Sequence, residues 1–118
     1  MGMMYVTAEL GPSRQRLAPV RFLVDTGSFY TIVPPGLAAE LGLTLPGSTN
    51  IMMADGTRVP APLGNAFIRI HDRESGTRES GTVVASMDVF TPLLGALSMQ
   101  LLDIKVNMKD ETIEFAEG

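Results

Sequence analysis

The sequence predicts a mainly β protein with one or two short helices. Most of its apolar residues fall in runs of strand length, and Gly, Pro and charged residues separate those runs. Only two segments have the apolar spacing of a helix. With 118 residues the chain has room for one hydrophobic core, so we expect a single domain over residues 1–118.

The N-terminal third predicts a hairpin followed by a loop and a helix. Residues 3–10 and 17–24 have the composition of strands, and the polar segment 11–16 predicts the turn between them. A short apolar run at 30–33 follows. Residues 34–42 begin with two prolines, continue with Ala and Leu, and end in Gly, which is typical of one short helix.

The middle of the chain predicts a second hairpin over residues 49–59. Asp55 and Gly56 lie between two extended runs, and Asp-Gly is a strong signal for a two-residue type I′ turn. Such a turn requires positive φ at both central residues. We therefore expect the tip of this hairpin at Asp55 and Gly56.

The C-terminal half predicts a long hairpin, a helix and a closing hairpin. Residues 64–71 alternate in polarity, the charged segment 72–76 turns, and the apolar run 82–85 returns. The apolar spacing over 94–102 suits a helix. Alternating faces over 104–115 predict the closing hairpin.

Composition excludes several classes of protein. The net charge is −4 and the basic residues are scattered, so we expect no nucleic-acid partner. No run approaches the roughly 20 apolar residues that a membrane-spanning helix needs, so we expect no membrane partner. The absence of Cys and the single His predict no metal site, and we expect no cofactor. The N-terminus lacks the pattern of a secretory signal, so we expect a cytoplasmic protein.

The most informative motif is Asp25-Thr26-Gly27-Ser28, which directly follows the apolar strand end Phe22-Leu23-Val24. Gly permits a tight turn, and the two hydroxyls can orient the carboxylate. An ordinary surface turn is the alternative, because all four residue types favour turns. The apolar residues on both sides of the motif argue against that alternative, since they bury the flanks of the loop.

The motif occurs once in the chain. Hydrolysis of an amide by carboxylates needs two of them facing each other, one ionised to activate water and one protonated to polarise the carbonyl. A single Asp25 per chain therefore predicts a homodimer.

Three elements in this order resemble a known family: the motif at 25–28, the hairpin at 49–59, and Pro92-Leu93-Leu94-Gly95-Ala96-Leu97. The chain resembles the retropepsin-like aspartic proteases, the single-domain and dimeric relatives of pepsin, and especially their bacterial branch. The resemblance implies a closed β-barrel, a flap formed by the hairpin, and a glycine-containing element packed beneath the catalytic loop.

The resemblance also implies roles for individual residues. Asp25 would be catalytic, in an active-site loop with Thr26, Gly27 and Ser28. Ser28 would donate to the outer oxygen of Asp25, and Thr26 would bond across the dimer. The implied substrate-binding residues are Phe29, Met53, Ala54, Asp55, Gly56 and Leu93.

The chain departs from the retroviral pattern at two positions. The retroviral enzymes carry a paired Asp and Arg where this chain has Phe29 and Ala96. Losing one charge alone would leave the other buried without a partner, whereas their joint replacement by apolar residues avoids that cost.

The predicted function is an aspartic endopeptidase in which two Asp25 carboxylates activate a water. Its substrate would be an extended peptide or unfolded protein held under two flaps, with preference for apolar side chains. One alternative is a catalytically silent dimer of the same fold that binds peptides or partners. A second alternative is a small β-barrel interaction module without paired carboxylates.

Overall fold

The computed structural model describes residues 3–116, so residues 1, 2, 117 and 118 of the expected domain lie outside it. Six strands close into a barrel, which confirms the mainly β fold and the closed barrel. In spatial order they are β1 (Tyr5–Ser13), β2 (Arg16–Val24), β7 (Leu93–Leu94), β3 (Thr31–Val33), β6 (Gly76–Ser86) and β5 (Arg58–Asp72). The barrel closes where β5 pairs with β1, at Leu10 opposite Ile68.

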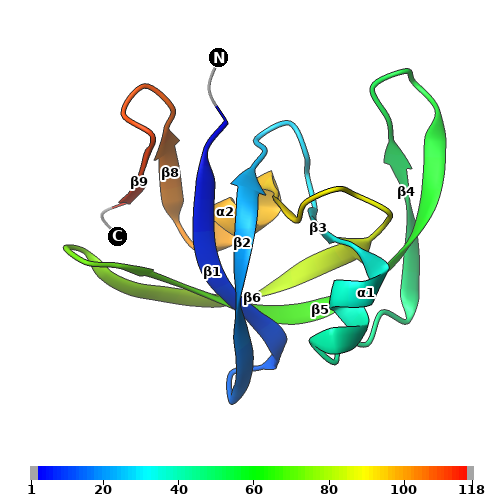
Figure 1. Ribbon diagram of the computed structural model, residues 1–118, viewed down its shortest axis with the longest axis horizontal. Helices are drawn as coiled ribbons and strands as arrows, with labels where there is room; N and C mark the ends of the chain where they lie inside the picture. The colour runs from blue at the N-terminus through cyan, green and yellow to red at the C-terminus, as the bar shows by residue number, and fades with distance from the viewer. Residues whose placement is uncertain (1–2, 117–118) are drawn as a thin grey trace.

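The remaining elements attach to this barrel (Figure 1). Strand β4 (Gly47–Met52) pairs with the first part of β5 and is the edge strand of the sheet. The hairpin that these two strands form projects from the barrel. Helix α1 (Pro35–Glu40) follows β3, and helix α2 (Ala96–Leu101) follows β7. Strands β8 (Ile104–Asn107) and β9 (Thr112–Phe115) form a separate two-stranded sheet.

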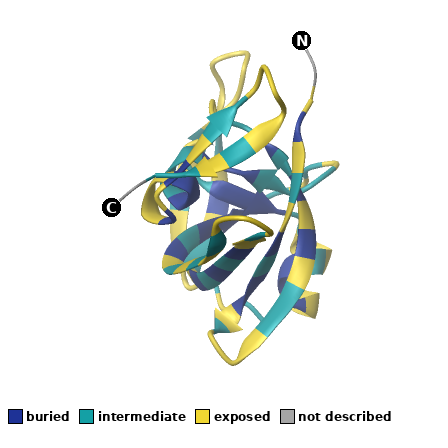
Figure 2. Cartoon of the chain, turned by 90° about the vertical axis from the view of Figure 1, so that its left-hand side faces the viewer, coloured by how far each residue is buried: buried dark blue, intermediate teal, exposed yellow. Residues whose placement is uncertain are grey.

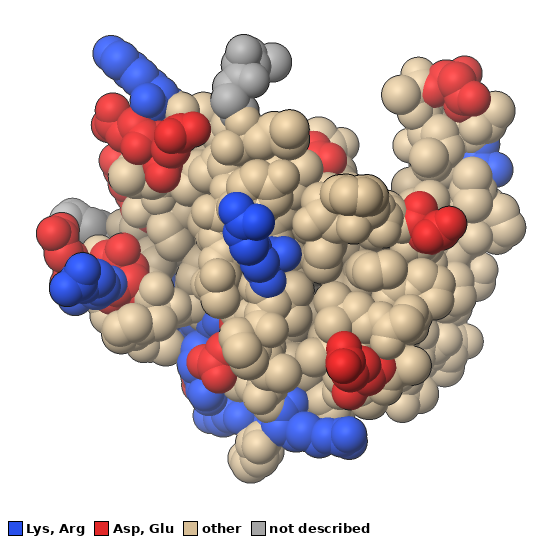
Figure 3. Space-filling model, in the orientation of Figure 1, with Lys and Arg blue, Asp and Glu red and all other residues tan. Residues whose placement is uncertain are grey.

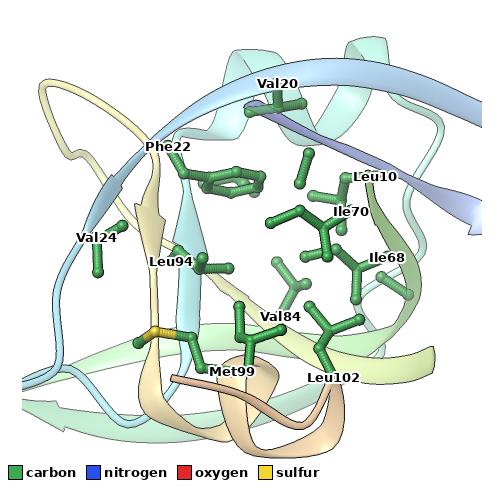
Figure 4. Close-up of a cluster of buried hydrophobic side chains, with 14 of the residues drawn as sticks. Leu10, Val20, Phe22, Val24, Ile68, Ile70, Val84, Leu94, Met99 and Leu102 are labelled. Carbon is green, nitrogen blue, oxygen red and sulfur yellow. The ribbon is translucent and has the colours of Figure 1, made fainter. Parts of the chain in front are cut away.

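The core lies inside the barrel and extends to α2. Buried residues alternate with exposed ones along the strands (Figure 2), as expected for strands with one face on a core. Figure 4 shows the aliphatic side chains of this core together with the ring of Phe22, which is 0% exposed. Leu94 and Met99 join the same cluster, so the segment around α2 is part of the core.

Arg78 on β6 ties the C-terminal hairpin to the barrel. Its guanidinium lies 4.9 Å from the centre of the Phe115 ring and 3.6 Å from the Asp103 carboxylate. It also donates to three carbonyl oxygens: Leu102 at 3.3 Å, Asp103 at 3.1 Å and Ala116 at 2.5 Å. A hydrogen-bonded cation therefore joins the residues on either side of the C-terminal hairpin to the start of β6.

The predicted helix over 94–102 is wrong at its start. Leu93 and Leu94 form β7, because their backbone pairs with β2 on one side and β3 on the other. Gly95 is extended, with φ −91° and ψ 170°, and α2 begins only at Ala96. Apolar spacing does not separate a buried two-residue strand from the first turn of a helix.

Two predicted turns are shorter than expected. Strand β1 continues to Ser13 and β2 restarts at Arg16, and β6 begins at Gly76 instead of residue 82. The added residues, 11–13 and 16 in the first hairpin and 76–81 of β6, are Gly, Pro, Ser, Thr or charged, although 76–81 pair with the part of β5 that carries the buried Ile68 and Ile70. Hydrophobic alternation therefore does not mark them. The helix predicted for 34–42 is confirmed as α1, and Gly42 follows it with φ 75°.

No helix within residues 3–116 is both long and apolar enough to cross a membrane.

Candidate active site

The Asp25 motif forms the start of the loop between β2 and β3, in the upper centre of Figure 1. The backbone N–H of Gly27 donates to Oδ1 of Asp25 at 3.0 Å, and the N–H of Ser28 donates to the Asp25 carbonyl at 3.1 Å. A Cβ at position 27 would lie 3.3 Å from the same Oδ1. Glycine is therefore favoured here by the close approach of the carboxylate.

The segment that contains β7 and the start of α2 lies directly against this loop. Gly95 has no room for a side chain, because a Cβ there would lie 2.3 Å from the carbonyl oxygen of Tyr30. Three backbone hydrogen bonds join the two segments: Asp25 N to Leu94 O at 3.0 Å, Ala96 N to Ser28 O at 2.7 Å, and Leu97 N to Phe29 O at 2.9 Å. The position of the carboxylate thus depends on a segment about 70 residues away in sequence.

The interaction expected of Ser28 is wrong. Its hydroxyl donates to the carbonyl oxygen of Tyr30 at 2.8 Å and makes no hydrogen bond with Asp25. The hydroxyl closes the loop on itself, which is the ordinary role of Ser in turns. Within residues 3–116, the Asp25 carboxylate accepts its hydrogen bond from the Gly27 amide and not from a hydroxyl.

An open groove with a volume of about 650 Å³ lies between the Asp25 loop and the β4–β5 hairpin. In Figure 3 the hairpin stands apart from the body of the protein, with this hollow beside it. Its lining comes from four segments: Asp25, Gly27–Tyr30 and Ile32 on the loop and β3, Asn50–Ala54 on the hairpin, Met87–Val89 after β6, and Leu93 on β7.

The groove contains some of the predicted site residues and not others. Phe29, Met53, Ala54 and Leu93 line it together with Asp25, Gly27 and Ser28. Asp55 and Gly56 lie at the hairpin tip and do not line it. Thr26 is exposed and lines a smaller hollow of about 400 Å³ between α2 and the C-terminal hairpin.

Sequence reasoning missed the segment after β6. Met87, Asp88 and Val89 line the groove, and Phe90 beside them is fully exposed. The sequence held no clear signal for this segment, because single apolar residues such as Phe90 are common on protein surfaces. Tyr30 and Ile32 also line the groove, although their apolar run suggested only burial.

The tip of the β4–β5 hairpin differs from the predicted type I′ turn. The amide of Gly56 donates to the Met53 carbonyl at 2.9 Å, and Gly56 alone has positive φ, at 88°. Asp55 instead accepts hydrogen bonds from Thr57, at 2.6 Å from the hydroxyl and 2.9 Å from the amide. These bonds hold the pKa of the Asp55 carboxyl below its ordinary value.

The groove combines an apolar lining with carboxylates. Its charged lining residues, among those the structure describes, are Asp25 and Asp88, and neither Lys nor Arg lines it. No group of potential metal ligands is found within residues 3–116. A carboxylate on the wall of a peptide-sized groove can accept a proton from water, but hydrolysis of an amide also requires a proton donor.

One comparison with known proteins agrees with this geometry. No curated protein matches the chain significantly. A family model described as aspartyl protease matches residues 7–96, a span that includes the Asp25 loop, the β4–β5 hairpin and Gly95. The C-terminal hairpin lies beyond the matched span. With most of its length matched, the chain belongs to the aspartyl protease family.

Proposed function

We propose that this protein is an aspartic endopeptidase that works as a homodimer. The observation that supports the proposal best is the position of Asp25, on a tightly held loop that lines an open groove. The Asp-Thr-Gly-Ser motif occurs once in the chain, and Asp88, the other carboxylate that lines the groove, lies outside it. A second copy, with its own Asp25 facing the first, would complete the reacting pair.

In this mechanism the two Asp25 carboxylates share one proton and bind a water between them. The ionised carboxylate takes a proton from the water, and the resulting hydroxide attacks the peptide carbonyl. The protonated carboxylate donates its hydrogen to the carbonyl oxygen. The carboxyl group that took a proton from the water then gives it to the amide nitrogen, and the C–N bond breaks as one hydroxyl proton of the diol returns to the other carboxylate. An amine and a carboxylic acid leave, and the pair again shares one proton.

The substrate would be an extended peptide. Strand β4 is the outermost strand of the sheet, so one of its backbone edges is free to pair with an added strand. The hairpin that it forms with β5 would act as a flap over the bound peptide. Phe29, Met53 and Leu93 would provide apolar walls for alternate side chains of the substrate.

Two other functions can be distinguished from an aspartic endopeptidase by experiment. A catalytically silent dimer of the same fold would bind peptides in the groove without cleaving them. A β-barrel interaction module without paired carboxylates would not need Asp25 at all.

Substitution of Asp25 separates an active enzyme from both alternatives. Asp25→Asn should abolish cleavage of an unstructured protein such as casein while leaving the circular dichroism spectrum unchanged, because an amide cannot act as the base. Asp72→Asn, at the far tip of the β5–β6 hairpin, is the matched control and should cleave at the parent rate. Equal cleavage by the Asp25→Asn variant and the parent would exclude Asp25 as the catalyst.

The pH profile provides a second measurement. Two carboxylates about 3 Å apart cannot both ionise, so the proposed pair works with one proton between its two acids. Cleavage should therefore be fastest in the mildly acidic range, where one proton is shared. A rate that rises steadily to alkaline pH would contradict a shared proton.

Dilution and subunit mixing test the dimer. Activity per chain should fall on dilution, because each protomer supplies half of the reacting pair. Excess Asp25→Asn chain added to the parent should inhibit it by forming mixed dimers, and sedimentation should show the dimer at working concentrations. Full activity at a concentration where sedimentation shows only monomer would refute the mechanism.

A further inference from the structure

Three hydroxyl side chains form a buried hydrogen-bonded cluster between α2, β3 and β6. Ser98 of α2 lies at its centre, with its Oγ 2.6 Å from Thr31 Oγ1 and 2.7 Å from Thr82 Oγ1. Ser98 and Thr31 are 0% exposed and Thr82 is 4% exposed. Hydroxyls in such a dry site need their partners, because an unpaired polar group there is costly.

The cluster is connected to the Asp25 loop through Gly95. The backbone N–H of Gly95 donates to Thr31 Oγ1 at 3.1 Å. Leu94 and Ala96, on either side of Gly95, hydrogen-bond to the backbone of the Asp25 loop, as does Leu97. Ser98 is thus the side chain that ties the start of α2 to both neighbouring strands, directly behind the loop.

We infer that Ser98 is a positioning residue for the Asp25 carboxylate. Its hydroxyl holds α2 against β3 and β6, and α2 and β7 hold the loop through their backbone bonds. The catalytic consequence of this inference rests on the proposed function. Its structural consequence, that Ser98 fixes the position of the Asp25 loop, does not rest on the proposed function.

Ser98→Ala tests the inference, because it removes both hydroxyl contacts while keeping the helix and nearly the same volume. We expect the kcat of the Ser98→Ala dimer to fall on the order of tenfold to a hundredfold with little change in KM, since small displacements of a reacting group have large effects on rate. Leu102→Val is the control. It removes one buried methylene near the end of α2 and leaves the hydroxyl cluster intact, so it should lower the melting temperature without lowering kcat.

A double variant separates positioning from a purely structural role. Ser98→Ala combined with Thr82→Val also removes the Thr82 hydroxyl that the single change leaves unpaired, so the melting temperature should recover part of its loss. The kcat should stay low, because the hydrogen bond between Ser98 and Thr31 is still absent. If kcat returns together with the melting temperature, Ser98 only stabilises the fold and the inference is overturned.

Amide hydrogen exchange tests the inference independently of catalysis. In Ser98→Ala the amides of Asp25, Ala96 and Leu97 should exchange at least about tenfold faster than in Leu102→Val, because these amides form the bonds that hold the loop. Unchanged exchange at all three would overturn the inference. If the parent shows no Asp25-dependent cleavage, the proposed function fails, and the exchange rates still decide whether Ser98 holds the loop.

Discussion

Gly95→Ala offers a direct test of how the β7–α2 segment supports the Asp25 loop. An added Cβ would lie 2.3 Å from the Tyr30 carbonyl oxygen and 2.8 Å from that of Phe29, whereas ordinary contact begins at 3.4 Å. The added Cβ and the Tyr30 oxygen must therefore move apart by about 1.1 Å, through movement of the backbone at residue 95 or of the loop. Because Tyr30 also accepts the Ser28 hydroxyl, the movement reaches the Asp25 motif itself.

The expected magnitude follows from these distances. Gly95 has a φ of −91°, which alanine adopts freely, so the substitution adds no backbone strain. Overpacking of a tight site costs about 1–3 kcal/mol, and the lower entropy of the unfolded alanine chain offsets about 0.4–1 kcal/mol of that. We expect a net destabilisation of about 1–2 kcal/mol. A shift of about 1 Å at a reacting group can lower the rate about a hundredfold.

The assay is a paired measurement of unfolding free energy and kcat/KM. Gly81→Ala is the control, because a Cβ at that position on β6 meets nothing within 4 Å. The control should keep the parent activity and be at least as stable as the parent. A Gly95→Ala variant with the stability and activity of the parent would refute the argument that this segment fixes the loop.

Three further predictions concern the periphery of the site. Gly56→Val should reduce kcat/KM and the affinity for a statine-type transition-state mimic more than it reduces the melting temperature, because a φ of 88° strains a β-branched residue at a projecting tip; unchanged kinetics would remove the tip from the mechanism. Thr57→Val should raise the pKa of Asp55 in an NMR titration, because it deletes the hydroxyl that lowers this pKa. In the parent, the hydrogen bonds to the Asp55 carboxylate stabilise the fold above the ordinary carboxyl pKa, and this stability is lost as the pH falls through the lower pKa of the folded state; the variant should show less of this loss. An unchanged pKa of Asp55 in the variant would contradict the prediction. Arg78→Met should speed amide hydrogen exchange throughout β8 and β9, because it removes the three hydrogen bonds from Arg78 to carbonyl oxygens of residues 102, 103 and 116. Equal exchange in the variant and the parent would show that packing alone holds the hairpin.

Local patterns in the sequence were enough to predict most of the strands and the candidate catalytic residue. Strands with one buried face alternate in polarity, so residues 64–71 and the closing hairpin at 104–115 could be located from residue types alone, and the composition of 3–10 and 17–24 located the first hairpin. The Asp25 motif was informative because its apolar flanks are unusual for a surface turn. The hairpin at 49–59 was also predicted, although its turn type was wrong, because the preference of Asp-Gly for type I′ yielded to a turn closed from Met53 to Gly56.

The tertiary structure decided what depends on contacts between distant segments. Leu93 and Leu94 form a strand only because β2 and β3 are there to pair with them. The part of the groove wall around Asp88 follows from strand order, which no local pattern encodes.

The same holds for the hydroxyls around Ser98. As sequence letters Thr31, Thr82 and Ser98 are three ordinary polar residues, and only the closed barrel brings them to hydrogen-bonding distance. The sequence thus determined which residue carries the carboxylate, because that information is local. The fold determined what holds the carboxylate in place, because a hydrogen bond depends on distances that chain neighbours do not set.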